Sequence, residues 1–308
     1  MAGKDTEGDS VSCRKVVAVI PAYNEERFIG SVVLKARKYV GDVLVVDDGS
    51  TDATVEVAEA AGAIVVRHER NQGKGVALNT GFHKAQGLEP EAVITLDGDG
   101  QHLAEQIPLV LTPILRGEAD IVVGSRYLER KSCVPLHRIW GHRVFTFLTN
   151  QAAGVPVTDS QSGFRAFSRQ AMEAIRFSSR SFSVESEMQF IAHGCHLKMV
   201  EVPITICYED KPKRSVIAHG LIVLSGILRL VGQYRPLLFF GVPGMLTLLA
   251  GLAWGARVVE IYRRLQTLAV GYALVSVLLS ILGSLSLFTG IILHSVRGLL
   301  LEMIRPQK

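Results

Sequence analysis

The chain has 308 residues, enough for one large α/β domain and a further segment. Hydrophobic residues make up 48% of it and its mean hydropathy is +0.28, which is high for a purely soluble protein. Most charged residues precede about residue 215 and the C-terminal third is nearly apolar, so we expect a catalytic part followed by a membrane part. The mild net charge of +4 gives no indication of nucleic-acid binding.

The N-terminus and the cysteines carry little further signal. Residues 1–13 are polar and contain no apolar stretch, so we expect a flexible tail and no signal peptide. The 4 cysteines form no CxxC pair and follow no regular spacing. This pattern favours free thiols in a reducing compartment over zinc ligands or disulfides.

Short apolar runs then alternate with helical patterns. Strands are expected at residues 16–20, 43–46, 64–66, 92–96 and 121–123. Helices are expected at residues 26–39, 51–61 and 75–85, and further along at 135–151 and 185–193. Ser50, Thr51 and Asp52 would cap the second of these helices. Alternation of this kind predicts an α/β fold with a doubly wound, mostly parallel sheet and helices on both faces.

The C-terminal third predicts a membrane segment. Residues 213–235 contain an apolar stretch whose helical spacing suits an interfacial amphipathic helix. Residues 236–256 and 265–296 are uncharged and long enough to cross a bilayer. We therefore expect a two-helix transmembrane hairpin within residues 236–296, with a short basic connection, and a tail at 297–308.

The distribution of basic residues predicts the orientation of this hairpin. The connection carries Arg257, Arg263 and Arg264. The other side carries a larger basic set, namely Arg229, Arg235, Arg297, Arg305 and Lys308. The positive-inside rule therefore favours an integral membrane protein with a cytoplasmic catalytic domain.

Polar clusters directly follow several predicted strands, where ligands of parallel α/β sheets bind. These clusters are residues 23–25, 47–50, 97–99 and 124–126. The chain has no GxGxxG and no GxxxxGK[ST], so it lacks the dinucleotide-binding fingerprint and is not expected to be a P-loop ATPase. The Gly-rich residues 71–75 fit neither pattern.

Asp97 and Asp99 are separated by one residue on a turn that leaves an apolar strand. Two such carboxylates can share Mg²⁺ or Mn²⁺, which usually takes one or two carboxylates plus substrate phosphates. Asp and Gly are also common turn residues, so the pair alone fits a simple turn. The neighbouring Gln101 and His102, and the acidic turn at Asp47 and its neighbours, favour the metal site. That acidic turn also fits two readings, a contact to a ribose or base and a plain turn with a helix cap.

Five segments in order together resemble family 2 glycosyltransferases of GT-A fold: residues 21–26 (PAYNEE), 46–52 (VDDGSTD), 71–75 (NQGKG), 96–102 (LDGDGQH) and 124–127 (GSRY). Residues 159–167 (DSQSGFRAF) and 182–188 (FSVESEM) resemble the dolichyl-phosphate mannose or glucose synthase branch. The resemblance covers about residues 15–215, so we expect a catalytic domain at 14–212. The two spans resemble the short membrane anchors of some branch members.

The resemblance implies roles for individual residues. Nucleotide-sugar contacts would come from Pro21, Tyr23, Glu25, Asp48, Gly73, Lys74, Asp97 and Gly98. Asp97, Asp99 and Gln101 would bind Mg²⁺ or Mn²⁺. The catalytic group would comprise Asp99, Arg126 and Asp159, the last at the position often proposed as base. The lipid phosphate would contact Arg126, Lys211, Lys213, Arg214 and Ser215. This last stretch departs from the family pattern, because proline and an extra basic residue stand where a glycine is usual.

Physical chemistry supports the basic cluster at residues 211–214, because a lipid phosphate must meet the donor at headgroup level. The same cluster would also serve membrane orientation alone. Arg138 and Arg143 fit either an acceptor contact or an ordinary helix surface. Glu185 and Glu187 open a predicted helix, where the helix dipole alone accounts for them.

The predicted reaction is an inverting transfer of a hexose from a nucleotide sugar to a polyisoprenyl phosphate. A phosphate monoester has a second pKa of about 6, so it needs little deprotonation, and Asp159 either removes a proton or positions groups. GDP-mannose, UDP-glucose and UDP-N-acetylglucosamine remain alternative donors, and another membrane or cell-envelope glycan is the alternative acceptor.

Other classes fit less well. A processive polysaccharide synthase would carry a QxxRW motif, which the chain lacks. A non-catalytic scaffold would not need Asp97, Asp99 and Asp159 together. A nucleotidyltransferase would need a Gly-rich basic loop in place of residues 21–27.

Overall fold

The computed structural model describes residues 15–128, 136–177, 184–206, 234–267 and 269–304, together with residues 225, 228, 231 and 232. The chain forms two compact units, residues 1–226 and 227–308. The predicted domain boundary at residue 212 and most of the predicted interfacial segment 213–235 lie outside the described residues.

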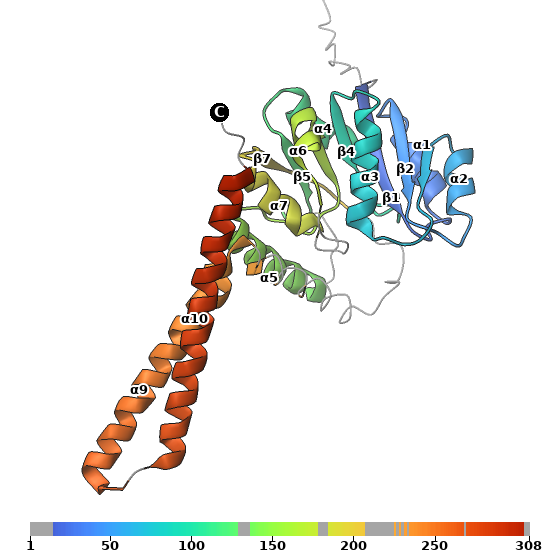
Figure 1. Ribbon diagram of the computed structural model, residues 1–308. Coiled ribbons are helices and arrows are strands. Elements are labelled where there is room, and N and C mark those ends of the chain that lie inside the picture. Colours follow the sequence, from blue (N-terminus) through green and yellow to red (C-terminus); the bar gives the residue numbers. More distant parts are fainter. Residues whose placement is uncertain are drawn as a thin grey trace, which may run out of the picture. The chain divides into compact units, whose positions relative to one another are not determined.

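The first unit is built on one sheet, in which the described strands follow the order β3-β2-β1-β4-β6-β5-β7 (Figure 1). All neighbouring strands are parallel except β6, which runs antiparallel between β4 and β5. The strands are β1 (Val16–Ala22), β2 (Asp42–Asp47), β3 (Ile64–Arg67), β4 (Ala92–Thr95), β5 (Ile121–Ser125), β6 (Arg165–Ser168) and β7 (Met199–Pro203). The predicted doubly wound, mostly parallel sheet is confirmed, and β6 and β7 are additions to it.

Helices cover both faces of the sheet because its strands alternate apolar side chains between two cores. Ala18 and Ile20 of β1 face the layer of α1 (Ile29–Ala36), α2 (Thr54–Ala60) and α4 (Ile107–Leu115). Val17 and Val19 face the opposite layer. This second layer consists of α3 (Lys74–Gln86), α6 (Arg169–Ala174) and α7 (Val184–Gly194). These helices cover the two faces of the sheet (Figure 1), and the apolar packing beneath them fixes the strand ends that carry the polar clusters.

The remaining elements differ modestly from the predicted bounds. A short helix η2 (Ala104–Gln106) precedes α4, and α5 (Leu136–Ala153) follows β5. The first helix begins at Ile29 rather than at Glu26, and residues 26–28 form a turn in which the carbonyl of Glu25 accepts from the backbone N–H groups of Phe28 and Ile29. The second helix begins at Thr54.

The second unit contains the π-helical η3 (Leu237–Gly241), α9 (Val242–Leu265) and α10 (Val270–Ile304). Segments Leu237–Leu265 and Val270–Leu299 are long and apolar enough to cross a membrane, as predicted from sequence. Helix α9 extends further than the predicted span and includes the arginines assigned to the connection. Glu260 accounts for this extension, because it pairs with Arg257 and Arg264 one helical turn away on either side.

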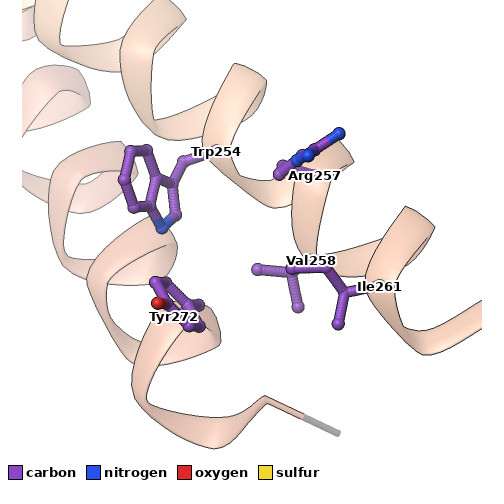
Figure 2. A pocket seen from close by; sticks show the side chains of 5 residues that line it. All are labelled: Trp254, Arg257, Val258, Ile261 and Tyr272. Atoms are coloured by element: carbon purple, nitrogen blue, oxygen red, sulfur yellow. The ribbon is translucent and has the colours of Figure 1, made fainter. Parts of the chain in front are cut away.

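Helices α9 and α10 lie side by side (Figure 1) through small residues, which let helix backbones approach closely in lipid. Ser276 Oγ donates to the carbonyl of Gly251 at 2.8 Å. A Cβ on Gly283 would lie 2.4 Å from the backbone nitrogen of Leu248. Near the connection the helices diverge around a cavity of about 350 Å³, with Trp254 and Tyr272 on one side of it (Figure 2).

Candidate active site

The polar clusters predicted from sequence lie at the carboxyl ends of β1, β2, β4 and β5, which meet at one edge of the sheet. The loops after β1 and β2 bind each other directly. Asn24 N donates to Ser50 Oγ at 2.9 Å, and Thr51 N donates to Asn24 Oδ1 at 2.9 Å. Beside them Pro21, the penultimate residue of β1, is half-buried, and Tyr23 is 40% exposed at the edge.

Asp48 holds the Gly-rich loop in place. Its buried carboxylate accepts from the backbone N–H groups of Gln72, at 2.9 Å, and Gly73, at 2.7 Å. The ring of His68 lies 2.8 Å from the same carboxylate. A carboxylate accepts about four hydrogen bonds. Asp48 therefore orders the start of α3. Its carboxylate has little hydrogen-bonding capacity left for the predicted contact to a nucleotide.

Lys74, the first residue of α3, lies between two carboxylates. Its Nζ is 2.6 Å from Asp97 Oδ1, at the end of β4, and 2.6 Å from Glu185 Oε1, in the first turn of α7. Glu185 is thus a member of the site, although from sequence it was explained only by the helix dipole. Its signal was the motif at residues 182–188, but spacing alone could not pair it with a lysine 111 positions earlier.

The two carboxylates of the DxD turn have different proton affinities. Burial would raise the pKa of Asp97, but the Lys74 ammonium and further positive groups outweigh it and hold that pKa at about 2. Burial and repulsion from Asp97 raise the pKa of Asp99 to about 6. Burial lowers the pKa of His102 to about 4, so its ring is neutral at pH 7 and Nδ1 accepts from Asp97 N at 3.2 Å.

These residues fit a divalent cation that also takes ligands from a substrate. Across the described ranges no group of three or more His, Cys, Asp or Glu side chains could hold a metal by itself. Asp97 and Asp99 therefore match the pattern of one or two carboxylates completed by phosphate oxygens. The pKa of Asp99 is raised by burial and by repulsion from Asp97, and a cation bound between the two carboxylates would offset both effects. Gln101 donates its backbone N–H to Asp99 at 3.1 Å, and its role as a metal ligand stays a prediction.

Arg126, after β5, and Asp159 form a bidentate ion pair. Arg126 Nε lies 2.6 Å from Asp159 Oδ2, and Nη2 lies 2.7 Å from Oδ1. Asp159 is fully buried, which would raise its pKa, but Arg126 outweighs burial and lowers it. Because the carboxylate is ionised and bound at both oxygens, the structure presents Asp159 as a partner that fixes the guanidinium.

A buried arginine supports the loop that carries Asp159. Arg165 of β6 has no exposed surface and donates to the carbonyls of Ser160, at 3.0 Å, and Ser162, at 2.9 Å. It also contacts Met188 of α7. The sequence predicted no role for Arg165, because arginine is mostly exposed in proteins. The available signal was its position between Phe164 and Phe167 in an otherwise apolar run.

The structure does not describe the other residues that were predicted to bind the lipid phosphate. Lys211, Lys213, Arg214 and Ser215 lie outside the described residues, as does the side chain of Arg138. Arg143 is exposed on α5. Gly98 is buried at the DxD turn, where a Cβ would lie 3.5 Å from Glu25 Cγ, so the predicted donor residues Glu25 and Gly98 are neighbours.

Known proteins resemble this chain in sequence and in fold. Residues 17–176, more than half of the chain, match the family described as Glycosyl transferase family 2. Over 217 residues the chain is 34% identical to UDP-N-acetylglucosamine–dolichyl-phosphate N-acetylglucosaminyltransferase of Methanococcus voltae, covering 63% of this chain and 86% of that protein. It is 30% identical to undecaprenyl-phosphate mannosyltransferase of Micrococcus luteus, covering 68% and 89%.

A solved structure gives the same result for the fold. Glucosyl-3-phosphoglycerate synthase of Mycobacterium tuberculosis, in complex with Mn²⁺, uridine diphosphate and glucosyl-3-phosphoglycerate, matches with a TM-score of 0.56 and 25% identity. The match covers 71% of this chain and 80% of that one. The chain belongs to glycosyl transferase family 2 and is a glycosyltransferase.

Proposed function

We propose that this glycosyltransferase moves a hexose from a nucleotide sugar to a polyisoprenyl phosphate at a membrane surface, with a divalent cation and with inversion at the anomeric carbon. The observation that carries the proposal is that two features lie at the same edge of the sheet: an acidic DxD turn and the bidentate ion pair of Arg126 and Asp159. The first suits a cation-bound diphosphate and the second suits a phosphate acceptor.

The donor half rests on the ends of β1, β2 and β4. The exposed ring of Tyr23 offers an apolar face to a base, and the DxD turn offers oxygen ligands to Mg²⁺ or Mn²⁺. A cation at Asp97 and Asp99 would neutralise charge that develops on the departing diphosphate. Lys74 stands beside the same turn with its ammonium already oriented. The Mn²⁺ complex of the solved relative supports a divalent cation in this fold.

The acceptor half rests on Arg126. A guanidinium binds phosphate through paired N–H groups, and a buried partner fixes its plane. Asp159 supplies that partner and, with a lowered pKa, would be a weak base. A lipid phosphate is largely dianionic at pH 7 and attacks without a base. We therefore assign Asp159 to positioning rather than to proton removal, with Lys211, Lys213, Arg214 and Ser215 as further phosphate contacts.

The lipid nature of the acceptor rests on the second unit and on the relatives. Two apolar helices of membrane-spanning length follow the catalytic unit. The relatives from Methanococcus voltae and Micrococcus luteus are named for dolichyl phosphate and undecaprenyl phosphate acceptors. Because those names carry different sugars, N-acetylglucosamine and mannose, donor identity is the variable to be measured. The distribution of arginines supports a cytoplasmic catalytic domain.

The test is a transfer assay on membranes that contain the full chain. Radiolabelled GDP-mannose, UDP-glucose and UDP-N-acetylglucosamine are each incubated with a polyprenyl phosphate and Mn²⁺ or Mg²⁺, and label is counted after extraction into organic solvent. We expect lipid label from one donor, lost with EDTA and with Asp99→Ala. Nucleotide release with label on a polar acceptor would instead support a different membrane or cell-envelope glycan as the acceptor.

A further inference from the structure

A lysine ammonium already lies where the predicted cation would act. Lys74 Nζ contacts Asp97 Oδ1 and Glu185 Oε1 at 2.6 Å each. The two carboxylates come from separate parts of the fold, the turn after β4 and the first turn of α7. Both contact one amine at the start of α3. Asp97 therefore has a positive partner before any metal arrives, and a metal must share or displace that partner.

The two carboxylates differ in their access to solvent. The side chain of Asp97 is 31% exposed, whereas that of Glu185 is 6% exposed and that of Lys74 is 19% exposed. A hydrated cation reaches Asp97 and its neighbour Asp99 from the open side of the turn. It does not reach Glu185 as readily, because the carboxylate is enclosed at the base of the site.

The backbone leaves the ammonium little room to move. A Cβ on Gly163 would lie 2.7 Å from Asp97 Oδ2 and 3.0 Å from Lys74 Nζ, so this loop packs directly on the ion pair. The loop itself is held by the buried Arg165, through the carbonyl of Ser162. Lys74 thus stays beside the turn even if its contact with Asp97 is lost.

We propose that Lys74 and the divalent cation compete for the Asp97 carboxylate, and that Glu185 is the positioning residue that retains Lys74 when the cation takes Asp97. The released N–H of Lys74 then donates to a phosphate oxygen of the departing diphosphate. This inference rests on the proposed function for the identity of that diphosphate, and the competition itself needs neither donor nor acceptor.

Competition predicts opposite effects on Mn²⁺ affinity for two substitutions. Lys74→Met removes the competing ammonium, so Mn²⁺ binding tightens by about fivefold or more. Glu185→Gln leaves Lys74 with Asp97 as its only charged partner among the contacts described, so Mn²⁺ binding weakens by about threefold. In the Lys74→Met background, Glu185→Gln should change Mn²⁺ affinity by a factor close to one, since Glu185 acts through Lys74.

The measurement is a titration of the full chain in detergent with Mn²⁺ alone, read by electron paramagnetic resonance of free Mn²⁺. Lys84→Met is the matched control, because Lys84 is exposed on the same helix α3 and should leave Mn²⁺ affinity and activity unchanged. The double variant Lys74→Met/Glu185→Gln leaves neither an ammonium nor an unpaired Glu185 carboxylate, so it supplies the comparison if Lys74→Met fails to fold.

Kinetics separate the positioning role from a structural one. At saturating Mn²⁺, Lys74→Met should lower kcat by about 10²-fold with a smaller change in donor KM, as for loss of a donor to developing charge. Lys74→Arg should restore part of kcat. The proposal is overturned if Lys74→Met leaves Mn²⁺ affinity unchanged or weaker, if no variant binds Mn²⁺, or if Glu185→Gln acts equally in both backgrounds. Lipid label that is lost with EDTA, together with an unchanged or weaker Mn²⁺ affinity of Lys74→Met or an equal effect of Glu185→Gln in both backgrounds, would leave the proposed function standing and remove this inference alone.

Discussion

Replacement of Arg126 by methionine should destabilise the catalytic unit, because it leaves Asp159 as a buried carboxylate without its charged partner. Removal of one member of a buried pair costs about 3–5 kcal/mol. Backbone N–H groups of Arg126 and Gln161 still donate to Asp159, at 3.1 and 3.3 Å, which favours the lower end of that range. A loss of about 3 kcal/mol corresponds to a decrease in Tm of about 6–12 °C for a unit of this size.

The loss of stability in Arg126→Met should depend on pH, and this dependence identifies the buried charge of Asp159 as its cause. In the wild type the pKa of Asp159 is lowered, so the pair stabilises the fold at neutral pH and this contribution is lost as pH falls through that lowered pKa. In the Arg126→Met variant the guanidinium no longer opposes burial, so the pKa of Asp159 should rise above its wild-type value, although backbone N–H groups still donate to the carboxylate. The variant then takes up a proton at a higher pH, and its deficit relative to wild type narrows as pH falls from 7 toward 4.

The assay is thermal unfolding of the full chain in detergent, followed by circular dichroism between pH 4 and pH 8. The double variant Arg126→Met/Asp159→Asn removes both charges and should be more stable than Arg126→Met alone. The reasoning fails if Arg126→Met unfolds within about 1 kcal/mol of wild type at pH 7. It also fails if the deficit is the same at every pH, because a buried charge would then not be its cause.

Three further predictions concern packing and the cation. Gly283→Leu should destabilise the hairpin by about 1–3 kcal/mol in thermal melts, whereas Gly298→Leu should not, since among the described residues nothing beyond the neighbouring turns of its own helix lies within 4 Å of its added Cβ. Gly49→Ala should cost more than Gly117→Ala in the same melts; both have positive φ, of 76° and 67°, but only Gly49 has a backbone 2.6 Å from the added Cβ. Because the pKa of Asp99 is raised to about 6, protons should compete with Mn²⁺, and the half-saturating Mn²⁺ concentration should rise as pH falls below 6.

The sequence predicted strands β1 to β5 because each of them is an apolar run followed by polar turn residues. Val16–Ala22 and Asp42–Asp47 both show this pattern and both are buried on two faces. Strand β6 escaped prediction because the charged Arg165 interrupts its apolar run, between Phe164 and Ala166, whereas in β3 the arginine only ends the run. Its antiparallel insertion between β4 and β5 depends on pairing partners that lie far away in the chain.

The candidate site was predictable in its parts but not in its pairings. The DxD turn and Arg126 were recognised because motif residues follow predicted strands. The pairing of Lys74 with Asp97, which are 23 positions apart, and of Arg126 with Asp159, which are 33 apart, depends on how the strands are ordered in space. Likewise, Glu185 resembled an exposed first-turn carboxylate until the packing of α7 against the sheet made its burial and its partner visible.

These pairings have a common physical consequence at the sheet edge. Each positive side chain, Lys74 and Arg126, is held by a carboxylate that is at least as buried as itself, Glu185 in one case and Asp159 in the other. A buried carboxylate fixes the position of the basic side chain but is itself not accessible to a ligand. The remaining N–H groups of the basic side chain can therefore donate to a phosphate. The same arrangement at the donor and acceptor halves would let two phosphates approach one another with their repulsion screened, since both ammonium and guanidinium are already oriented before either substrate binds.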